Sequence, residues 1–555
     1  MKKIFYSIIL LFLLKNSNAS DLRERIYVQT DKHLYLAGEP VLMKFLTTNT
    51  DQIPIVFSKI AYTELVADSV GLIQIMVELT NGTGTGQMVL PADLPTGYYR
   101  LIAYTKFMRN EGHGVFFEKN IAVLNTFQSG YQPVETDHNL SNSAATDSDF
   151  GTILLQTNKT NYTTRERGEL ILTGLLDNLY TLSVSITGRD FVNNNETNIS
   201  LFNRNLTKES IGFSGTYAPE YEGHILSGKI IDNETGTNAK ETMASPGVAF
   251  PGEEIIFFAG QKNETGDVMF FTSGVSGSKE IATVVYDLDE QYRVDIISPF
   301  VSRFAPKQMP TLQIDSAYFS QLLERSVALQ VFRYFSDELS ENQTVFESNL
   351  KITPSRAYRL DDYTRFTTMR EVFVEFIDGA RFRRNDGKQV MSVLTRRGSF
   401  LDYGTMPLVV LDGVPIVDHA AIFNYDPLSV EYINVYYGPF TLGGIRFDGI
   451  VELKTYRGLH QNLSLNRSSQ VLSYEAPQSP YIFISNDYSD ENNRRSRIPD
   501  GRHTLLWNTD VKTNGNTSFR MPFDTSDLIG EFHATIEGIT KDGKMIYVTT
   551  YFKVE

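Results

Sequence analysis

The residue types that most often carry catalysis are present in this chain, but their spacing is not that of known catalytic motifs. The eight histidines form neither the His-Glu-x-x-His nor the His-x-His spacing that holds a catalytic zinc ion. The nearest approach to a Gly-x-Ser-x-Gly nucleophile elbow is the segment at 274–277, which lacks the required spacing. Because the chain has no cysteine, thiol catalysis, zinc–thiolate sites and an internal thioester are excluded. The sequence therefore predicts a protein that is not an enzyme.

Three polar segments could bind a ligand or react, and each has a simpler interpretation. The glycine-rich run at 81–86 lacks the helix start and the lysine of a phosphate loop, so we expect a hairpin loop there. The acidic segment 487–492 offers oxygen ligands for calcium but lacks the EF-hand glycine and glutamate, which favours a solvated loop. Asp361 and Asp362 could be paired acids, but neighbours on an extended segment point in opposite directions. We expect neither a metal ion nor a cofactor.

The first 20 residues have the pattern of a secretory signal peptide. Lys2 and Lys3 precede an apolar run at 4–14, and a short exit segment follows at 18–20. The run is too short for a membrane-spanning helix, and no cysteine near the expected cleavage site could carry a lipid anchor. We therefore expect an exported chain, periplasmic and associated with the outer membrane, or presented at the cell surface. The mature chain is expected to have no transmembrane span of its own.

Charge and cysteine content narrow the class of protein further. The formal net charge is −15, and removing Lys2, Lys3 and Lys15 with the signal peptide would leave about −18. Such a chain has no basic surface long enough to follow nucleic-acid phosphates, so nucleic-acid binding is not expected. Without disulfides, each domain depends on core burial alone. A secreted chain without disulfides fits a bacterial envelope best.

The pattern along the mature chain is that of a mainly β, multi-domain protein. Short apolar and aromatic runs are separated by Gly, Asn, Asp and Pro at the spacing of β-sandwiches. Two segments resemble the second macroglobulin-like domain of the α2-macroglobulin and complement superfamily, namely VQTDKHLYLAGEPV (28–41) and LPADLPTGYYRLIAYT (90–105). The resemblance implies a seven-stranded sandwich over 21–126, in which Gly38 and Gly97 permit turns.

The middle of the chain divides into four further segments. We expect a linker at 127–150, a second β-sandwich at 151–220, and a connecting segment at 306–355 that could begin with a helix at Asp315. The segment between the second sandwich and the connecting segment resembles carboxypeptidase-regulatory-like modules, through HILSGKIIDNETG and NETGDVMFF. This resemblance implies a non-catalytic β-domain at 221–305.

The segment 356–458 carries a second resemblance. An amphipathic helix is expected at 367–378, followed by an apolar strand with the sequence LDGVP and by VEYINV and GIVELKTYRG. This order resembles the plug domain of TonB-dependent outer-membrane receptors, particularly the SusC-like transporters of Bacteroidota. Only 97 residues follow Gly458, too few for a barrel of about 22 strands at roughly 10 residues each. We therefore expect no transmembrane barrel and a C-terminal β-domain at 459–555.

A plug-like domain without its barrel suggests a docking function. We predict a non-enzymatic cell-envelope scaffold that docks an outer-membrane barrel protein or a transporter complex. The candidate contacts are the LDGVP turn and an arginine-rich stretch, for which a solvated surface is the alternative. These candidate residues are Asp412, Gly413, Val414, Pro415, Arg381, Arg383, Arg384, Arg396 and Arg397.

Two other functions remain open. The chain could be a surface-exposed adhesin or glycan-binding protein, with its aromatic-rich loops against sugars. It could also be a cargo of type IX secretion, because its end at 541–555 is rich in strand-forming residues. A macroglobulin-type protease trap is disfavoured because the thioester cysteine is absent.

Overall fold

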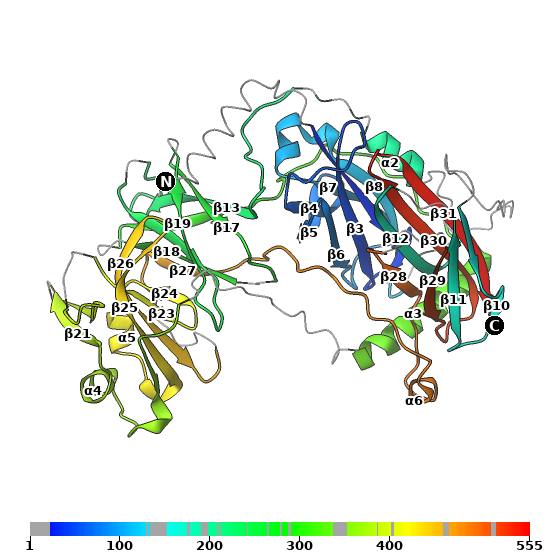
Figure 1. The fold of residues 1–555 in the computed structure, drawn as a ribbon. Coiled ribbons are helices and arrows are strands. Elements are labelled where there is room, and N and C mark those ends of the chain that lie inside the picture. The colour runs from blue at the N-terminus through cyan, green and yellow to red at the C-terminus, as the bar shows by residue number, and fades with distance from the viewer. Residues whose placement is uncertain are drawn as a thin grey trace. The chain divides into compact units, whose positions relative to one another are not determined.

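A computed structural model describes residues 23–128, 131, 133, 153–174, 178–189, 198–206, 208, 210, 212–240, 242–263, 266–277, 280–286, 290–336, 352–385, 387–400, 405–458, 465–511 and 518–555. The expected signal peptide and most of the expected linker at 127–150 lie outside these residues. The described chain is mainly β, as predicted. It forms two compact units, unit 1 (Met1–Tyr221, Val301–Asn342 and Gln478–Glu555) and unit 2 (Glu222–Phe300 and Gln343–Pro477) (Figure 1). Among the described helices, none is both long enough and apolar enough to cross a membrane.

Unit 1 begins with a β-sandwich whose sheets have the strand orders β1-β3-β6 and β2-β8-β7-β4-β5. Its elements are β1 (Glu24–Thr30), β2 (Leu34–Leu36), β3 (Pro40–Asn49), β4 (Ile60–Ala67), β5 (Val70–Glu78), β6 (Thr83–Val89), β7 (Gly97–Tyr104), η1 (Phe107–Glu111), η2 (His113–Val115) and β8 (Phe117–Leu124). Gly38 has a φ of 94°, which favours glycine in the turn before β3, whereas Gly97 starts β7 without a positive φ. The region at 21–126, expected to be a sandwich, is thus a two-sheet sandwich over its described residues.

A second sandwich of unit 1 is built from two distant parts of the sequence. Its sheets have the orders β10-β31-β30-β12-β28 and β29-β11-β9. The strands are β9 (Leu154–Thr157), β10 (Asn161–Tyr162), β11 (Arg167–Thr173), β12 (Leu179–Gly188), β28 (Thr504–Asn508), β29 (Ser518–Asp524), β30 (Gly530–Thr540) and β31 (Met545–Val554), accompanied by α2 (Asn198–Leu206) and α6 (Glu491–Arg494). In Figure 1 the red strands β30 and β31 lie beside β12.

This arrangement differs from the expectation of separate β-domains at 151–220 and 459–555. Val184 of β12 pairs with Ile536 of β30, and Leu170 of β11 pairs with Met521 of β29. All four side chains are buried in one core. The early strands β9 to β12 form only part of each sheet, and the late strands β28 to β31 complete both.

The helix expected after Asp315 is present as α3 (Ser316–Ser336). It continues past Val327 to Ser336. Arg325 of this helix makes a buried, bidentate ion pair with Glu39 of the first sandwich, at 2.9 and 2.5 Å. Helix α3 is therefore anchored to the first sandwich by a charge pair and by apolar contacts of Leu322.

Unit 2 contains three packed sheets and one small hairpin. The sheet orders are β16-β17-β13-β19, β15-β14-β18-β27 and β20-β25-β26-β23-β24, and the hairpin is β21-β22. The elements are β13 (His224–Asp232), β14 (Ser245–Ala249), β15 (Phe257–Ala259), β16 (Gln261–Lys262), β17 (Asp267–Thr272), β18 (Glu280–Tyr286), β19 (Tyr292–Ile297), β20 (Arg356–Arg359), η3 (Leu360–Asp362), α4 (Met369–Glu375), β21 (Ala380–Asn385), β22 (Lys388–Val393), β23 (Leu408–Leu411), β24 (Val414–Ile416), α5 (Ala420–Phe423), η4 (Pro427–Ser429), β25 (Val430–Leu442), β26 (Ile445–Thr455) and β27 (Ser469–Ser473).

The middle sheet of unit 2 is buried on both faces. Along β18, Ile281 and Val285 pack into the core with the first sheet, whereas Ala282 and Val284 pack into the core with the third. Because side chains alternate along a strand, one strand can serve two cores. The carboxypeptidase-regulatory-like region and the plug-like region, expected as separate domains at 221–305 and 356–458, thus share a hydrophobic core. β27, expected in the C-terminal domain, also belongs to this middle sheet.

The amphipathic helix expected at 367–378 is confirmed as α4. Thr368 caps it, and the side chain of Glu371 returns to the Thr368 amide, completing a capping box. Met369, Val372 and Phe373 are buried, as the spacing predicts. The helix packs on β21 and so positions the arginine-rich hairpin.

Candidate interaction site

The LDGVP turn connects β23 to β24 and lies inside unit 2. Asp412 has a φ of 48° and is 3% exposed. Its carboxylate accepts hydrogen bonds from the amide and hydroxyl of Thr455, at 2.8 and 2.7 Å. The main-chain oxygen of Asp412 accepts a hydrogen bond from the amide of Gly252 at 3.1 Å. The aspartate therefore orders the turn rather than facing solvent.

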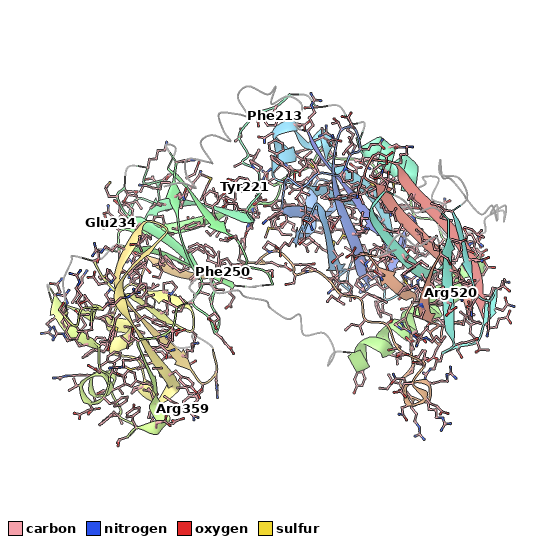
Figure 2. All side chains as sticks on the ribbon, viewed as in Figure 1. Phe213, Tyr221, Glu234, Phe250, Arg359 and Arg520 are labelled. Atoms are coloured by element: carbon pink, nitrogen blue, oxygen red, sulfur yellow. The ribbon has the colours of Figure 1, made fainter. Side chains whose placement is uncertain are left out.

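The neighbouring turn residues are also enclosed. Gly413 has a φ of 80°, and a Cβ there would lie 2.8 Å from the Gly252 nitrogen, so the close approach requires glycine. Val414 and Pro415 are buried as well. Figure 2 labels Phe250, which begins the β14–β15 connection against which this turn packs.

The structure thus differs from the expectation that this turn contacts a partner. Its contact is the chain's own β14–β15 connection. Turns usually lie on the surface, and nothing in LDGVP distinguishes a turn that packs against a second sheet.

The arginine-rich stretch forms a hairpin on the outside of unit 2. β21 and β22 pair so that Arg381 faces Ser392 and Arg383 faces Val390. Phe382 points to the other face, where its ring contacts Phe373 of α4 and Phe423 of α5 at centroid distances of 4.9 and 5.1 Å. These aromatic contacts hold the hairpin against the unit.

Two of the arginines lie over aromatic rings. The Arg381 guanidinium is 4.0 Å from the ring centroid of Phe400, and that of Arg396 is 5.5 Å from Phe440. The Nε of Arg396 also donates to the main-chain oxygen of Tyr437 at 3.4 Å. Each ring limits the positions that its guanidinium can adopt.

Four of the five predicted arginines are solvent-facing. Arg381, Arg384, Arg396 and Arg397 are exposed, and Arg383 is half-buried. Among the described residues, none of the four exposed arginines has an acidic side chain within ion-pair distance. We use the name arginine face for Arg381, Arg384, Arg396 and Arg397 as a group, in which Arg384 alternates to the side of β21 opposite Arg381.

The other polar segments considered from the sequence have local structural roles. Asp490 caps α6, and the Asp487 carboxylate accepts hydrogen bonds from Ser489 and Arg167. Asp361 accepts a hydrogen bond from the Tyr456 hydroxyl at 2.6 Å. The segment 81–86 is the turn into β6 and that strand's first half, and it joins strands of different sheets. Within the described residues, no group of three acidic or histidine side chains is placed to hold a metal ion.

A polar cluster that sequence spacing could not reveal lies where the two sandwiches of unit 1 meet. The Asp31 carboxylate accepts a hydrogen bond from the Thr504 hydroxyl at 2.8 Å, across 473 positions of sequence. Burial lowers the pKa of His33 and His503 well below the usual value, and nearby cations lower it further. The two histidines are therefore uncharged, and their role in unit 1 is structural.

A small hollow also lies between these sandwiches. Its polar walls bond to each other: the Tyr27 hydroxyl donates to Glu537 at 2.5 Å, and Lys44 donates to Thr181 at 2.8 Å. Burial, together with the Glu537 carboxylate, raises the pKa of Tyr27 well above its usual value. These groups join the two sandwiches to each other.

No family model matches the chain, and no curated protein matches it in sequence. Among solved structures, it is similar to the α2-macroglobulin of Salmonella reacted with methylamine, with 10% identity and a TM-score of 0.24 over 96% of this chain and 40% of that chain. It is also similar to the Escherichia coli α2-macroglobulin activated by porcine elastase, with 12% identity and a TM-score of 0.23 over 96% and 44%.

The Escherichia coli adhesin FdeC is a third similar structure, with 10% identity and a TM-score of 0.14 over 52% of this chain and 64% of that chain. The chain spans less than half the length of the two macroglobulin structures. TM-scores this low establish no shared overall fold, so the proposal below rests on the geometry of the chain itself.

Proposed function

We propose that this chain is a non-catalytic, exported interaction protein that binds an outer-membrane partner through the arginine face of unit 2. One observation carries the proposal: four exposed arginines belong to one hairpin and the segment that follows it, without acidic partners among the described residues. The chain as a whole carries a net charge of −15. A basic surface on so acidic a protein is a specific feature rather than a general property of its surface.

The charge of the hairpin supports a partner of opposite charge. Residues 380–400 contain six basic residues and one acidic residue, a net charge of +5. Some other guanidinium groups pair within the chain, as Arg325 does with Glu39 and Arg165 does with Asp527. Charge complementarity across an interface raises the association rate and selects the partner.

The sheet β20-β25-β26-β23-β24 acts as the platform in this proposal. It carries the residues that resemble a TonB-receptor plug, and its LDGVP turn is fixed by Thr455 and Gly252. Val393 at the end of the hairpin packs on Gly449 of β26, where a Cβ would lie 2.4 Å from the Val393 Cγ1. A plug-like platform with a basic hairpin suits docking to an outer-membrane transporter or assembly complex.

Affinity purification from detergent-solubilised outer membranes tests the proposal. The tagged chain is compared with a variant in which Arg381, Arg384, Arg396 and Arg397 are each replaced by glutamate. The matched control reverses four exposed arginines of unit 1, namely Arg494, Arg495, Arg497 and Arg520, the last labelled in Figure 2. Both variants change the net charge equally, and the control additionally loses the exposed ion pairs of Arg495 with Glu491 and of Arg520 with Glu169.

We expect an outer-membrane protein to co-purify with the wild type and with the control, and to be lost from the arginine-face variant. Recovery of the wild type as a free monomer would contradict the proposal. Equal recovery of the partner with all three proteins would contradict the role of the arginine face.

A further inference from the structure

We infer that the arginine face recognises carboxylates on an acidic segment of a partner protein, rather than the phosphates of a membrane surface. The inference rests on the proposed function, because it names the chemistry of the partner that the same surface binds. Three observations point to it. Two concern unit 2: aromatic rings lie against two of the guanidinium groups, and the hairpin has an edge without a strand partner. The third is the negative net charge of the whole chain.

The stacked arginines are prepared for planar acceptors. Phe400 lies 4.0 Å from the Arg381 guanidinium, and Phe440 lies 5.5 Å from that of Arg396. A ring below the guanidinium plane leaves its N–H edges available, and these edges match the two oxygens of a carboxylate. Because each ring already restricts its arginine, less side-chain entropy is lost when an acceptor binds.

The hairpin also has an edge that a protein segment can use. Within the described residues, β21 pairs with no strand other than β22, so its outer edge has no strand partner. An open edge presents main-chain N–H and C=O groups, to which an extended segment of a partner can add as a further strand. Arg381 lies on this edge strand, so an added acidic strand brings its carboxylates beside the arginine face. A lipid headgroup cannot make this backbone pairing.

The charge of the remaining chain disfavours an anionic membrane as the partner. A membrane surface presents negative charge to the whole molecule, whose net charge is −15. A short acidic segment presents its charge over a smaller area than a membrane does, and charges farther away than a Debye length of roughly 8 Å are largely screened at physiological salt. The arginine face therefore attracts a short acidic segment, and the acidic remainder of the chain repels that segment less than it repels an anionic membrane.

Fluorescence anisotropy with the full-length chain tests the inference. The probe is a labelled ten-residue peptide that alternates glutamate and threonine, and the same peptide with glutamine for glutamate is its uncharged counterpart. Vesicles of phosphatidylglycerol and phosphatidylcholine provide the membrane arm, measured by co-sedimentation. The variants replace the four arginines of the face with glutamine or with lysine, and the unit 1 control replaces Arg494, Arg495, Arg497 and Arg520 with glutamine.

We expect the acidic peptide to bind the wild type and the unit 1 control with equal affinity. The glutamine variant of the arginine face should bind at least about tenfold more weakly, which corresponds to about 1.4 kcal/mol. The lysine variant keeps the charge but lacks the planar fork, so it should also bind more weakly than the wild type. Circular dichroism spectra and melting curves matching the wild type would show that the variants remain folded.

Several results would overturn the inference. These are the absence of peptide binding, equal binding of the acidic and uncharged peptides, equal affinity of the lysine variant, and preferential binding to the vesicles. The two proposals fail differently. Peptide binding without a co-purifying outer-membrane protein would contradict only the proposed function. Arginine-dependent co-purification without peptide binding would contradict only the carboxylate inference.

Discussion

His419 makes the stability of unit 2 depend on pH in a way that can be measured. The side chain is 1% exposed, and its Nδ1 accepts a hydrogen bond from the Met391 amide at 2.9 Å. The Nε2 is buried and has no hydrogen-bond partner among the described residues. Burial lowers the pKa of His419 to about 4 because no compensating charge replaces the lost hydration.

The sign and size of the effect follow from linkage. In the unfolded chain the histidine has a pKa of about 6.5. Between about pH 6.5 and pH 4, the unfolded state therefore binds more protons than the folded state, and stability falls as the pH falls. A difference of about 2.5 units corresponds to about 3 kcal/mol in total, of which about 2 kcal/mol is lost by pH 5.

Urea unfolding at a series of pH values tests this reasoning. Trp507, the single tryptophan, is buried in β28, so its fluorescence reports unit 1, while circular dichroism reports both units. The variant His419→Asn keeps an oxygen that can accept the Met391 amide but does not titrate. Relative to this variant, the wild-type unit 2 transition should lose about 2 kcal/mol between pH 7.5 and pH 5.

The Trp507-detected transition should be identical in the wild type and the variant at every pH. Parallel pH dependence of the unit 2 transition in the two proteins would refute the assignment of this loss to His419.

Three further outcomes are expected. Gly413→Ala should destabilise unit 2 by about 2–3 kcal/mol in urea unfolding, because the added Cβ would meet Gly252. Gly444 has a φ of 96° but open space around it, so Gly444→Ala should cost only about 1 kcal/mol. An equal cost at both sites would contradict the packed turn. Burial would raise the pKa of Glu39, but Arg325 and Lys32 hold it at about 2. Arg325→Met removes the main partner of this carboxylate and should lower the Trp507-detected stability of unit 1 by about 3–5 kcal/mol. The double variant with Glu39→Met should recover part of the loss, and no recovery would argue against the ion pair. Removing 545–555 should expose Trp507 to solvent, measured as a red shift of its emission, because β31 pairs with β30 over ten residues and Phe552 is core; unchanged fluorescence would contradict the discontinuous sandwich.

The truncation also bears on the type IX secretion hypothesis. Deletion of 541–555 would test for a secretion signal in this segment. Since β31 belongs to the core of the second sandwich, such a deletion removes structure as well as any signal. Point substitutions of exposed residues such as Tyr551 (43% exposed) would separate the two effects.

Local patterns that depend on neighbours in sequence were predictable. The apolar spacing and the Thr368 and Glu371 capping box specify α4 within a few residues. Gly38 marks a turn because its backbone needs a positive φ. The arginine-rich stretch was also identifiable, because charged side chains at this density are exposed unless they are paired.

The sequence by itself determined the class of structure: alternating apolar residues, turn residues and the absence of cysteine require β-domains that are stabilised by core burial. Only the tertiary structure decided which strands share a core. Ala282 and Ile281 alternate as any strand does, yet they face two different cores, and Val184 meets Ile536 from 352 positions away. The burial of the LDGVP turn against the β14–β15 connection was also decided by tertiary packing. A strand's periodicity states that a face is buried, but the partner that buries it depends on packing over long sequence separations, which local patterns do not encode.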